Sequence, residues 1–167
     1  MAEQDQAEKR IGIQKVYVKD FSFESPRAPE VFTSGEWSPK TNLNLRSTHT
    51  PVTDDVHEVV LTITVETKHE DKTLFLVELH QAGLFQISGY NEQEFEAIVG
   101  SFCPGSLFPY ARESIAGVVT KGGFPEFLLQ PINFDVLYAE GKKKAMEQAA
   151  AQAANPSPGN GGNGGSH

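Results

Sequence analysis

The chain has 167 residues, of which 14 are Lys or Arg and 22 are Asp or Glu, so its formal net charge is -8 and its length suits one ordinary domain. An acidic domain lacks the basic surface that binds a phosphate backbone, and a single cysteine, Cys103, can form no internal disulfide. The polar N-terminus and the absence of an apolar run of about 18 residues predict a cytoplasmic protein with no membrane insertion and no nucleic-acid partner.

The two ends of the chain differ from its middle in composition. Residues 1–10 are polar, and residues 155–167 offer no side chain able to form a core, so we expect both segments to be disordered. Residues 139–154 are rich in helix formers but poor in large apolar residues, which predicts a solvated helix extension. The folded domain is therefore expected over residues 11–138.

Three segments alternate between apolar and polar residues with period two, as half-buried strands do. They are residues 11–24, 56–67 and 73–81, and the polar link between the last two predicts a hairpin. Each has one apolar face and one face of acids mixed with small or isolated apolar residues, as in an antiparallel sheet with one wet face. In the first segment, the alternation places Ile11, Ile13, Tyr17, Phe21 and Phe23 on one face and Val16 and Val18 on the other. The acids predicted on the polar faces are Asp20, Glu24, Glu58, Glu66 and Glu78.

The long connection between Pro26 and Thr53 contains four prolines, two aromatic residues and a short alternation that predicts a short strand. Long connections are often functional. Phe32 and Trp37 either pin this crossover onto the core or line a groove that opens to solvent. The sequence leaves both interpretations open.

After the strands, the apolar period changes to that of helices. Asn91 and Glu94 have the spacing of a capping box, and the helix that follows is expected to end near Cys103-Pro104-Gly105. A second helix is predicted from about Pro109 to Lys121, where two glycines stop it, and a third from Asn133 to before Pro156. Strands followed by helices indicate the α+β class.

No group of residues has the spacing of a known catalytic or metal site. The five histidines include no pair at i, i+4, the GxSxG and phosphate-loop motifs are absent, and nothing beside Cys103 would activate its thiol. We therefore expect no enzyme activity and no cofactor. The acids of the polar sheet faces are either a soluble surface or, because Leu76 lies among them, an interface.

Three segments match a known family: YVKDFSFESPRAPEVF, HQAGLFQISG and CPGSLFPYARESIAGVVTKGGFPEFLLQPINFDVLY, in which LFPYARE, GGFP and PINFD follow at the family's spacing. Through these segments, residues 11–138 show a resemblance to the SecB family of bacterial export chaperones. It implies a four-stranded antiparallel sheet packed against helices and assembly as a homotetramer, a dimer of dimers.

The resemblance also implies a function and the residues that carry it. SecB proteins bind unfolded secretory precursor proteins without ATP and deliver them to the SecA motor, whose basic, zinc-containing C-terminal segment docks on the sheet. The positions that match the SecA contacts are Asp20, Glu24, Leu76 and Glu78. The positions that match the client-binding groove are Phe32, Trp37, Leu43, Leu45, Leu137 and Tyr138.

Two other hypotheses remain at this stage. One is a SecB-like chaperone dedicated to a single partner, such as the antitoxin of a toxin–antitoxin system. The other is an enzyme or small-ligand carrier built around Cys103 and the apolar groove. The acids matching the SecA contacts favour the export role over the first, and slow alkylation of Cys103 would remove the second.

Overall fold

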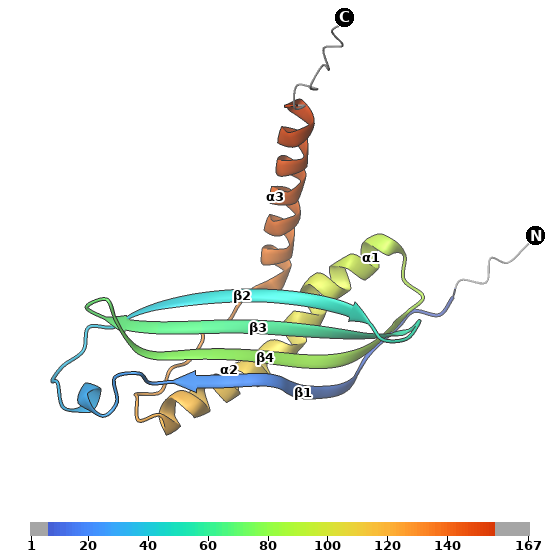
Figure 1. The fold of residues 1–167 in the computed structure, drawn as a ribbon. Helices are drawn as coiled ribbons and strands as arrows, with labels where there is room; N and C mark the ends of the chain where they lie inside the picture. Colours follow the sequence, from blue (N-terminus) through green and yellow to red (C-terminus); the bar gives the residue numbers. More distant parts are fainter. Residues whose placement is uncertain (1–6, 156–167) are drawn as a thin grey trace, which may run out of the picture.

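A computed structural model describes residues 7–155 as one antiparallel sheet with helices on one of its faces (Figure 1). The α+β prediction is confirmed. A 3-10 turn at Glu30–Phe32 follows the first strand, and a π-helical turn at Ile98–Phe102 joins the first two helices. The strands and helices are β1 (Arg10–Glu24), β2 (Lys40–Pro51), β3 (Val56–His69), β4 (Lys72–Ser88), α1 (Glu92–Ala97), α2 (Cys103–Lys121) and α3 (Phe134–Ala154).

The strands lie in the order β1-β4-β3-β2, so the connection from β1 to β2 crosses from one edge of the sheet to the other. The predicted hairpin between β3 and β4 is confirmed, and its turn is tight: Glu70 and Asp71 both have positive φ, at 49° and 61°. Two consecutive residues with positive φ are typical of turns that match the twist of a hairpin. The three long pairings place β3 and β4 at the centre of the sheet.

Two irregularities in β1 change which of its side chains face the core. The register with β4 shifts between Ile13 and Lys15 and again between Val18 and Asp20. Each extra residue reverses the alternation, because side chains of a strand point to opposite faces with period two. The predicted faces of Tyr17, Val16 and Val18 are therefore wrong: Tyr17 lies on the outer face, where it bonds Glu58, and the two valines lie on the core-facing side. The residues of β1 paired with the core-facing positions of β4 are Ile11, Ile13, Val16, Val18, Phe21 and Phe23.

Two strands are longer than predicted. β2 has twelve residues rather than the short strand expected around Leu43 and Leu45, and β4 continues to Ser88 instead of ending near residue 81. The extension of β4 pairs with both neighbours, for example Phe85 with Ile13 and with His57. Pairing on both sides stabilises a segment whose own alternation is interrupted by small residues.

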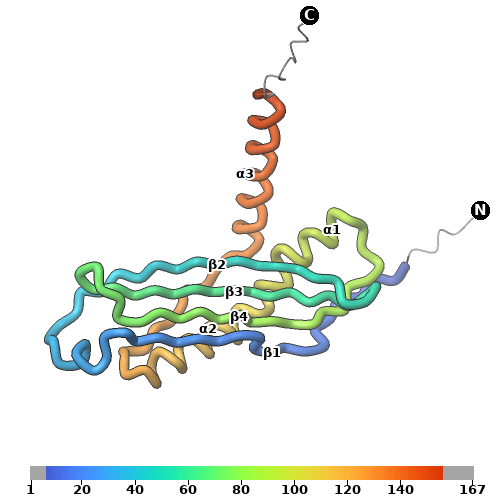
Figure 2. Tube along the Cα trace, viewed as in Figure 1, coloured from blue at the N-terminus to red at the C-terminus, as the bar shows by residue number. Residues whose placement is uncertain are grey.

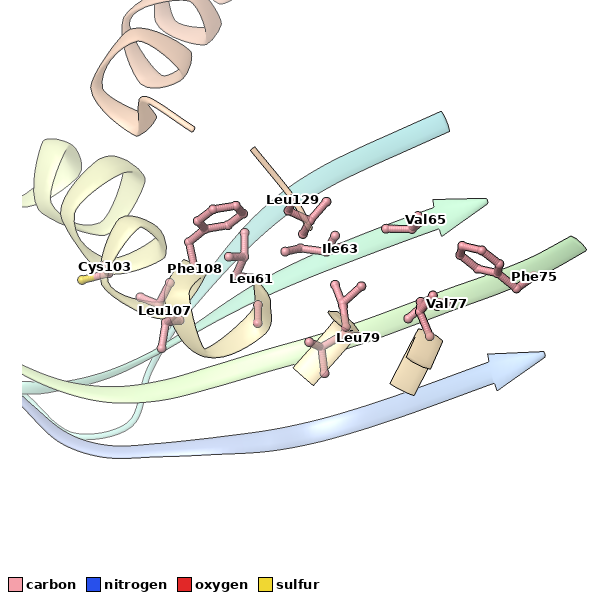
Figure 3. Packing of buried hydrophobic residues seen from close by; sticks show 14 of the residues in the cluster. Leu61, Ile63, Val65, Phe75, Val77, Leu79, Cys103, Leu107, Phe108 and Leu129 are labelled. Atoms are coloured by element: carbon pink, nitrogen blue, oxygen red, sulfur yellow. The ribbon is translucent and has the colours of Figure 1, made fainter. Parts of the chain in front are cut away.

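The hydrophobic core fills the space between α2 and one face of the sheet, which we call the core face (Figure 3). The alternate residues of β3 and β4 that point there are buried, as Leu61, Ile63, Val77 and Leu79 illustrate. α2 contributes a stripe of buried residues at helical spacing. Leu129, from the segment after α2, is buried in the same core near Ile63. The buried stripe of α2 is Cys103, Leu107, Ala111, Ile115 and Val119.

The helical region is nearly continuous, contrary to prediction. The capping box of Asn91 and Glu94 starts α1 as predicted, but the chain then passes through the π-helical turn directly into α2. Pro104 lies in the first turn of α2, directly after the π-helical turn, and Pro109 lies inside the helix. A proline inside a helix costs about 3 kcal/mol, which the burial of the apolar stripe of α2 offsets.

α3 begins at the predicted N-cap, since the side chain of Asn133 accepts a hydrogen bond from the Val136 N–H. Its first turn packs on the π-helical turn: the ring of Tyr138 fills the space where Gly100 lacks a Cβ, and Ser101 Oγ bonds Asp135. Beyond this contact α3 extends away from the sheet, and it has no buried residue (Figures 1 and 2). Within residues 7–155, no helix is long and apolar enough to cross a membrane.

The structure tests only part of the predictions for the two ends of the chain. Arg10 already belongs to β1, and Lys9 Nζ lies 2.8 Å from Glu94 Oε1 of α1. The helix extension predicted at residues 139–154 continues α3 without a break. The predictions for residues 1–6 and for the tail from residue 156 lie outside the described residues.

Candidate functional site: an acidic sheet face and an aromatic pocket

The four residues predicted to contact SecA lie together on the outer face of the sheet, opposite the core face. Glu24 of β1 is paired with Leu76 of β4, and Leu76 is paired on its other side with Glu66 of β3. Side chains at paired positions have Cβ atoms about 4.5–5.5 Å apart, so one half-buried leucine is flanked by carboxylates. We call this patch the acidic sheet face, and it comprises Asp20, Glu24, Glu66, Leu76 and Glu78.

The fifth outward acid, Glu58, has partners of its own. Its carboxylate accepts a hydrogen bond from Lys19 Nζ at 2.8 Å and another from the hydroxyl of Tyr17. These bonds, that of Lys19 first, hold the pKa of Glu58 below its usual value. Burial, together with the Glu58 carboxylate, raises the pKa of Tyr17 to about 12, so its hydroxyl remains a donor. Glu58 is therefore compensated within the sheet.

The charges of the acidic sheet face are less compensated than that of Glu58. Among residues 7–155, no lysine or arginine nitrogen lies within 4 Å of the carboxylates of Asp20, Glu24 or Glu78. Glu66 accepts a hydrogen bond from Thr73 and has Lys68 at 3.7 Å. This face therefore offers three carboxylates beside the apolar side chain of Leu76. Protein interfaces typically combine an apolar centre with a polar rim in this way.

A small cavity of about 180 Å³, which we call the aromatic pocket, opens on the core side at the hairpin end of the sheet. Phe124 is its centre: its ring centroid lies 5.0 Å from that of Phe75 and 5.7 Å from that of Trp37. Phe75 and Phe124 are each only 4% exposed, so the floor of the pocket is also part of the core. The lining residues are Trp37, Pro39, Thr41, Thr67, Leu74, Phe75, Phe124, Pro125, Glu126 and Phe127.

The structure answers the question left open about the crossover aromatics. Trp37 Nε1 donates a hydrogen bond to the Val31 carbonyl at 3.1 Å, which pins the connection, while the half-buried indole also lines the aromatic pocket. Phe32 remains 45% exposed, with its ring 5.4 Å from Phe124. Trp37 therefore holds the crossover in place and lines the pocket, and Phe32 extends the apolar surface beside it.

The other predicted groove residues do not line this pocket. Leu43 and Leu45 lie on the core-facing side of the edge strand β2, paired with Val65 and Ile63, and Leu43 is exposed. Leu137 and Tyr138 belong to the first turn of α3, where they line a separate, open hollow of about 400 Å³ with residues of α1 and the π-helical turn. The structure thus divides the six residues among three places.

Sequence reasoning missed the three phenylalanines that line the aromatic pocket, which are Phe75, Phe124 and Phe127. The period-two alternation of residues 73–81 places Phe75 on the apolar face of its strand, and its place in the pocket depends on the strand reaching the hairpin end. Phe124 and Phe127 follow the glycines that end α2, where Gly123 has a positive φ of 88°. Two phenylalanines and a proline among the four residues after the glycine stop were the one available signal that this segment returns to the sheet.

Cys103 is fully buried at the start of α2, and burial raises the pKa of its thiol to about 12. A thiol in this state is protonated and is a poor nucleophile, since the thiolate is the reactive form. Two histidines, His49 and His57, meet across β2 and β3 with ring nitrogens 2.8 Å apart, a contact that chain spacing had not indicated. Within residues 7–155, no three His, Cys, Asp or Glu side chains form a group that could hold a metal ion.

Comparisons with known proteins agree on one family. Residues 4–145 match the family described as preprotein translocase subunit SecB. Similar curated proteins include the protein-export protein SecB of Nitrosococcus oceani, 49% identical over 86% of this chain and 88% of that protein. The protein of the same name from Methylococcus capsulatus is 50% identical over 88% of this chain and 94% of that protein.

A solved structure has a similar fold. A Mycobacterium tuberculosis SecB-like chaperone, in complex with a ChAD peptide from the HigA1 antitoxin, superposes with a TM-score of 0.62. The alignment covers 74% of this chain and 91% of that one, at 17% sequence identity. At this identity the likeness concerns the fold alone.

Proposed function

Since the chain belongs to the SecB family of protein-export chaperones, we propose that it binds unfolded precursor proteins in the cytoplasm without ATP and delivers them to the SecA motor. The family is one of chaperones and not of enzymes. The observation that carries the finer proposal is the separation of two recognition surfaces: an acidic face on the outside of the sheet and an aromatic pocket on its core side. Two surfaces allow client and motor to be bound at the same time.

Client binding is proposed to begin at the aromatic pocket and the exposed apolar residues around it. An unfolded chain offers the apolar side chains that a folded protein has buried, and burying one large side chain contributes about 1.5–3 kcal/mol. Phe32 lies beside the pocket, and Leu43 and Leu137 offer further apolar contacts at two other places, each of the three being more than 40% exposed. Many weak contacts along one chain add up to useful avidity, which needs no nucleotide.

SecA docking is proposed at the acidic sheet face. Asp20, Glu24 and Glu78 supply negative charge, and Leu76 supplies an apolar contact at the centre of the patch. Complementary charge mainly raises the association rate and selects the partner, while the leucine contributes burial. The basic segment that the family resemblance implies for SecA fits both features.

The family resemblance also leads us to propose a homotetramer built as a dimer of dimers. Among residues 7–155, β1 pairs with β4 only, so within this part of the chain one edge of the fifteen-residue strand is free to pair with another copy. The helical side exposes large apolar residues that a second dimer would cover, among them Phe102, Tyr110 and Leu128. Light scattering should give four times the chain mass of 18.3 kDa.

The hypothesis of a chaperone dedicated to one antitoxin is less well supported. Relatives named for protein export are 42–50% identical to this chain, whereas the chaperone bound to an antitoxin peptide is 17% identical. The hypothesis of an enzyme built around Cys103 is also less well supported, because burial favours the protonated thiol, which is a poor nucleophile. Export remains the function that the chain supports best.

The test follows a slowly folding precursor diluted from denaturant with and without this protein. We expect the protein to suppress the light scattering of the aggregating precursor, and SecA added to the isolated complex to bind it before the precursor leaves. Unchanged aggregation would contradict the client-holding part of the proposal. Displacement of the client by SecA without a ternary complex would contradict the two-surface arrangement.

A further inference from the structure

His80 lies within the acidic sheet face and has no role in the function proposed so far. It follows Glu78 by two residues on β4, so both side chains point outward, and its Nε2 lies 2.9 Å from Glu78 Oε1. On the neighbouring strands it is paired with Asp20 of β1 and Thr62 of β3. The imidazole is 25% exposed, so it is in contact with both the sheet and the solvent.

The charged groups around His80 are mostly carboxylates. Its own strand contributes Glu78, and β1 contributes Asp20 directly opposite. From β3 it faces the uncharged Thr62, beyond which Arg46 of β2 is the nearest basic position in the register. On β1 the nearest basic residue in the chain is Lys19, and its side chain is bound to Glu58. A positive charge on His80 would therefore partly cancel the negative charges of Asp20 and Glu78 and weaken their attraction for a basic partner.

We propose that His80 is a proton-dependent specificity residue of the acidic sheet face, which weakens docking of a basic partner when it is protonated. The inference rests on the proposed SecA docking at this face. Histidine is the side chain that changes charge between pH 5 and 8. Neutral His80 donates to Glu78 through Nε2 and leaves the carboxylate charge for the partner, whereas protonated His80 forms an ion pair with it.

Linkage gives the sign of the effect. A basic segment binds the face with neutral His80 more tightly, so docking displaces the histidine proton, and a falling pH opposes docking. Partly exposed charge pairs change an equilibrium constant by about two- to fivefold. We therefore expect the affinity for SecA to fall by about two- to fivefold between pH 8 and pH 6.

The experiment measures SecA binding to the full chain by titration calorimetry at pH 6 and pH 8, for the wild type and for His80→Gln. Glutamine keeps a hydrogen-bonding side chain that does not titrate. The wild type should lose affinity at pH 6, and His80→Gln should lose clearly less. Titration of SecA itself affects both proteins equally, so it cancels from the comparison.

A second readout identifies the proton directly. Calorimetry at pH 6.5 in two buffers of different ionisation enthalpy should show proton release on docking for the wild type and less release for His80→Gln. His49→Gln is the matched control, because His49 belongs to the edge strand β2 and faces the core side of the sheet, opposite the acidic sheet face. It should behave as the wild type does in both measurements.

The outcomes separate this inference from the docking proposal. If the wild type binds SecA at pH 8 and His80→Gln keeps the full loss of affinity at pH 6, the role of His80 is wrong while docking stands. The same holds if the wild type shows no pH dependence. If SecA does not bind at pH 8, or binds Glu78→Lys unchanged, then docking at this face is wrong and the role of His80 falls with it.

Discussion

The acidic sheet face and the aromatic pocket belong to the same strands but differ in how their residues are held. The face consists of side chains on the wet side of a sheet, placed by their strand positions and by partly exposed polar contacts such as that of Glu78 with His80. The pocket is assembled from the crossover, the hairpin end and the segment after α2, and its floor is part of the core. A change in the pocket should therefore disturb both stability and binding, whereas a change on the face should alter binding only.

The strongest test of this difference is the replacement of the pocket floor. Phe124 contacts Phe32, Trp37 and Phe75 and is nearly fully buried, so Phe124→Ala removes core packing and leaves a cavity. We expect the free energy of unfolding to fall by about 3–5 kcal/mol, measured by chemical denaturation. A loss below about 1 kcal/mol would show that the pocket is independent of the core.

Trp37 lies at the rim and separates the two effects better. Trp37→Ala should weaken binding of an unfolded precursor by about 1–3 kcal/mol, because it removes a large aromatic anchor. Affinity for SecA should stay at the wild-type value. Precursor titration gives the first quantity and SecA titration the second, under conditions where denaturation shows the variant to be folded. Equal precursor affinity in variant and wild type would assign Trp37 to packing alone.

Charge reversal on the face should have the opposite profile. Glu78→Lys places a cation beside Leu76 and should weaken SecA binding about tenfold, because like charges then meet across the contact. Suppression of precursor aggregation and the denaturation midpoint should remain near the wild-type values. Asp20→Lys should act in the same direction.

Glu96→Lys is the matched control for these reversals, since Glu96 is an exposed acid on α1, away from the sheet face. It changes the net charge by the same amount, so a similar loss of SecA affinity would mean that total charge matters and the face does not. Unchanged affinity for both sheet variants would refute the assignment of the face.

The smallest predicted effect concerns pH and stability on the core side of the sheet. Burial lowers the pKa of His49, and neighbouring His57 lowers it further. The unfolded chain then binds the proton more readily, so the free energy of unfolding should fall as the pH drops below about 6.5 and be fully retained above it. His49→Gln should show a shallower loss than the wild type in denaturation experiments at pH 7.5 and pH 5.5.

Local patterns predicted the parts of this fold that local chemistry controls. The capping box of Asn91 and Glu94 and the glycine stop after Lys121 both formed where they were expected, because their hydrogen bonds and backbone angles depend on a few neighbouring residues. The period-two alternation in β3 and β4 likewise placed Glu66, Leu76 and Glu78 on one face.

Where distant residues compete with a local preference, the predictions failed. The break expected at Pro104 did not form, because the apolar stripe of α2 packs on the sheet along its whole length. The predicted face of Tyr17 was wrong because β1 contains two extra residues in its pairing with β4. Alternation within one strand cannot reveal such irregularities.

By itself, then, the sequence determined the class of the fold, the acidic outer face and the family to which the chain belongs. These depend on residue type and short spacing, which can be read along the chain. Only the tertiary structure decided that Phe75, Phe124 and Trp37 form one pocket and that His80 lies against Glu78 opposite Asp20. Those contacts join residues that are distant in the chain, and strand register and packing against the core bring them together.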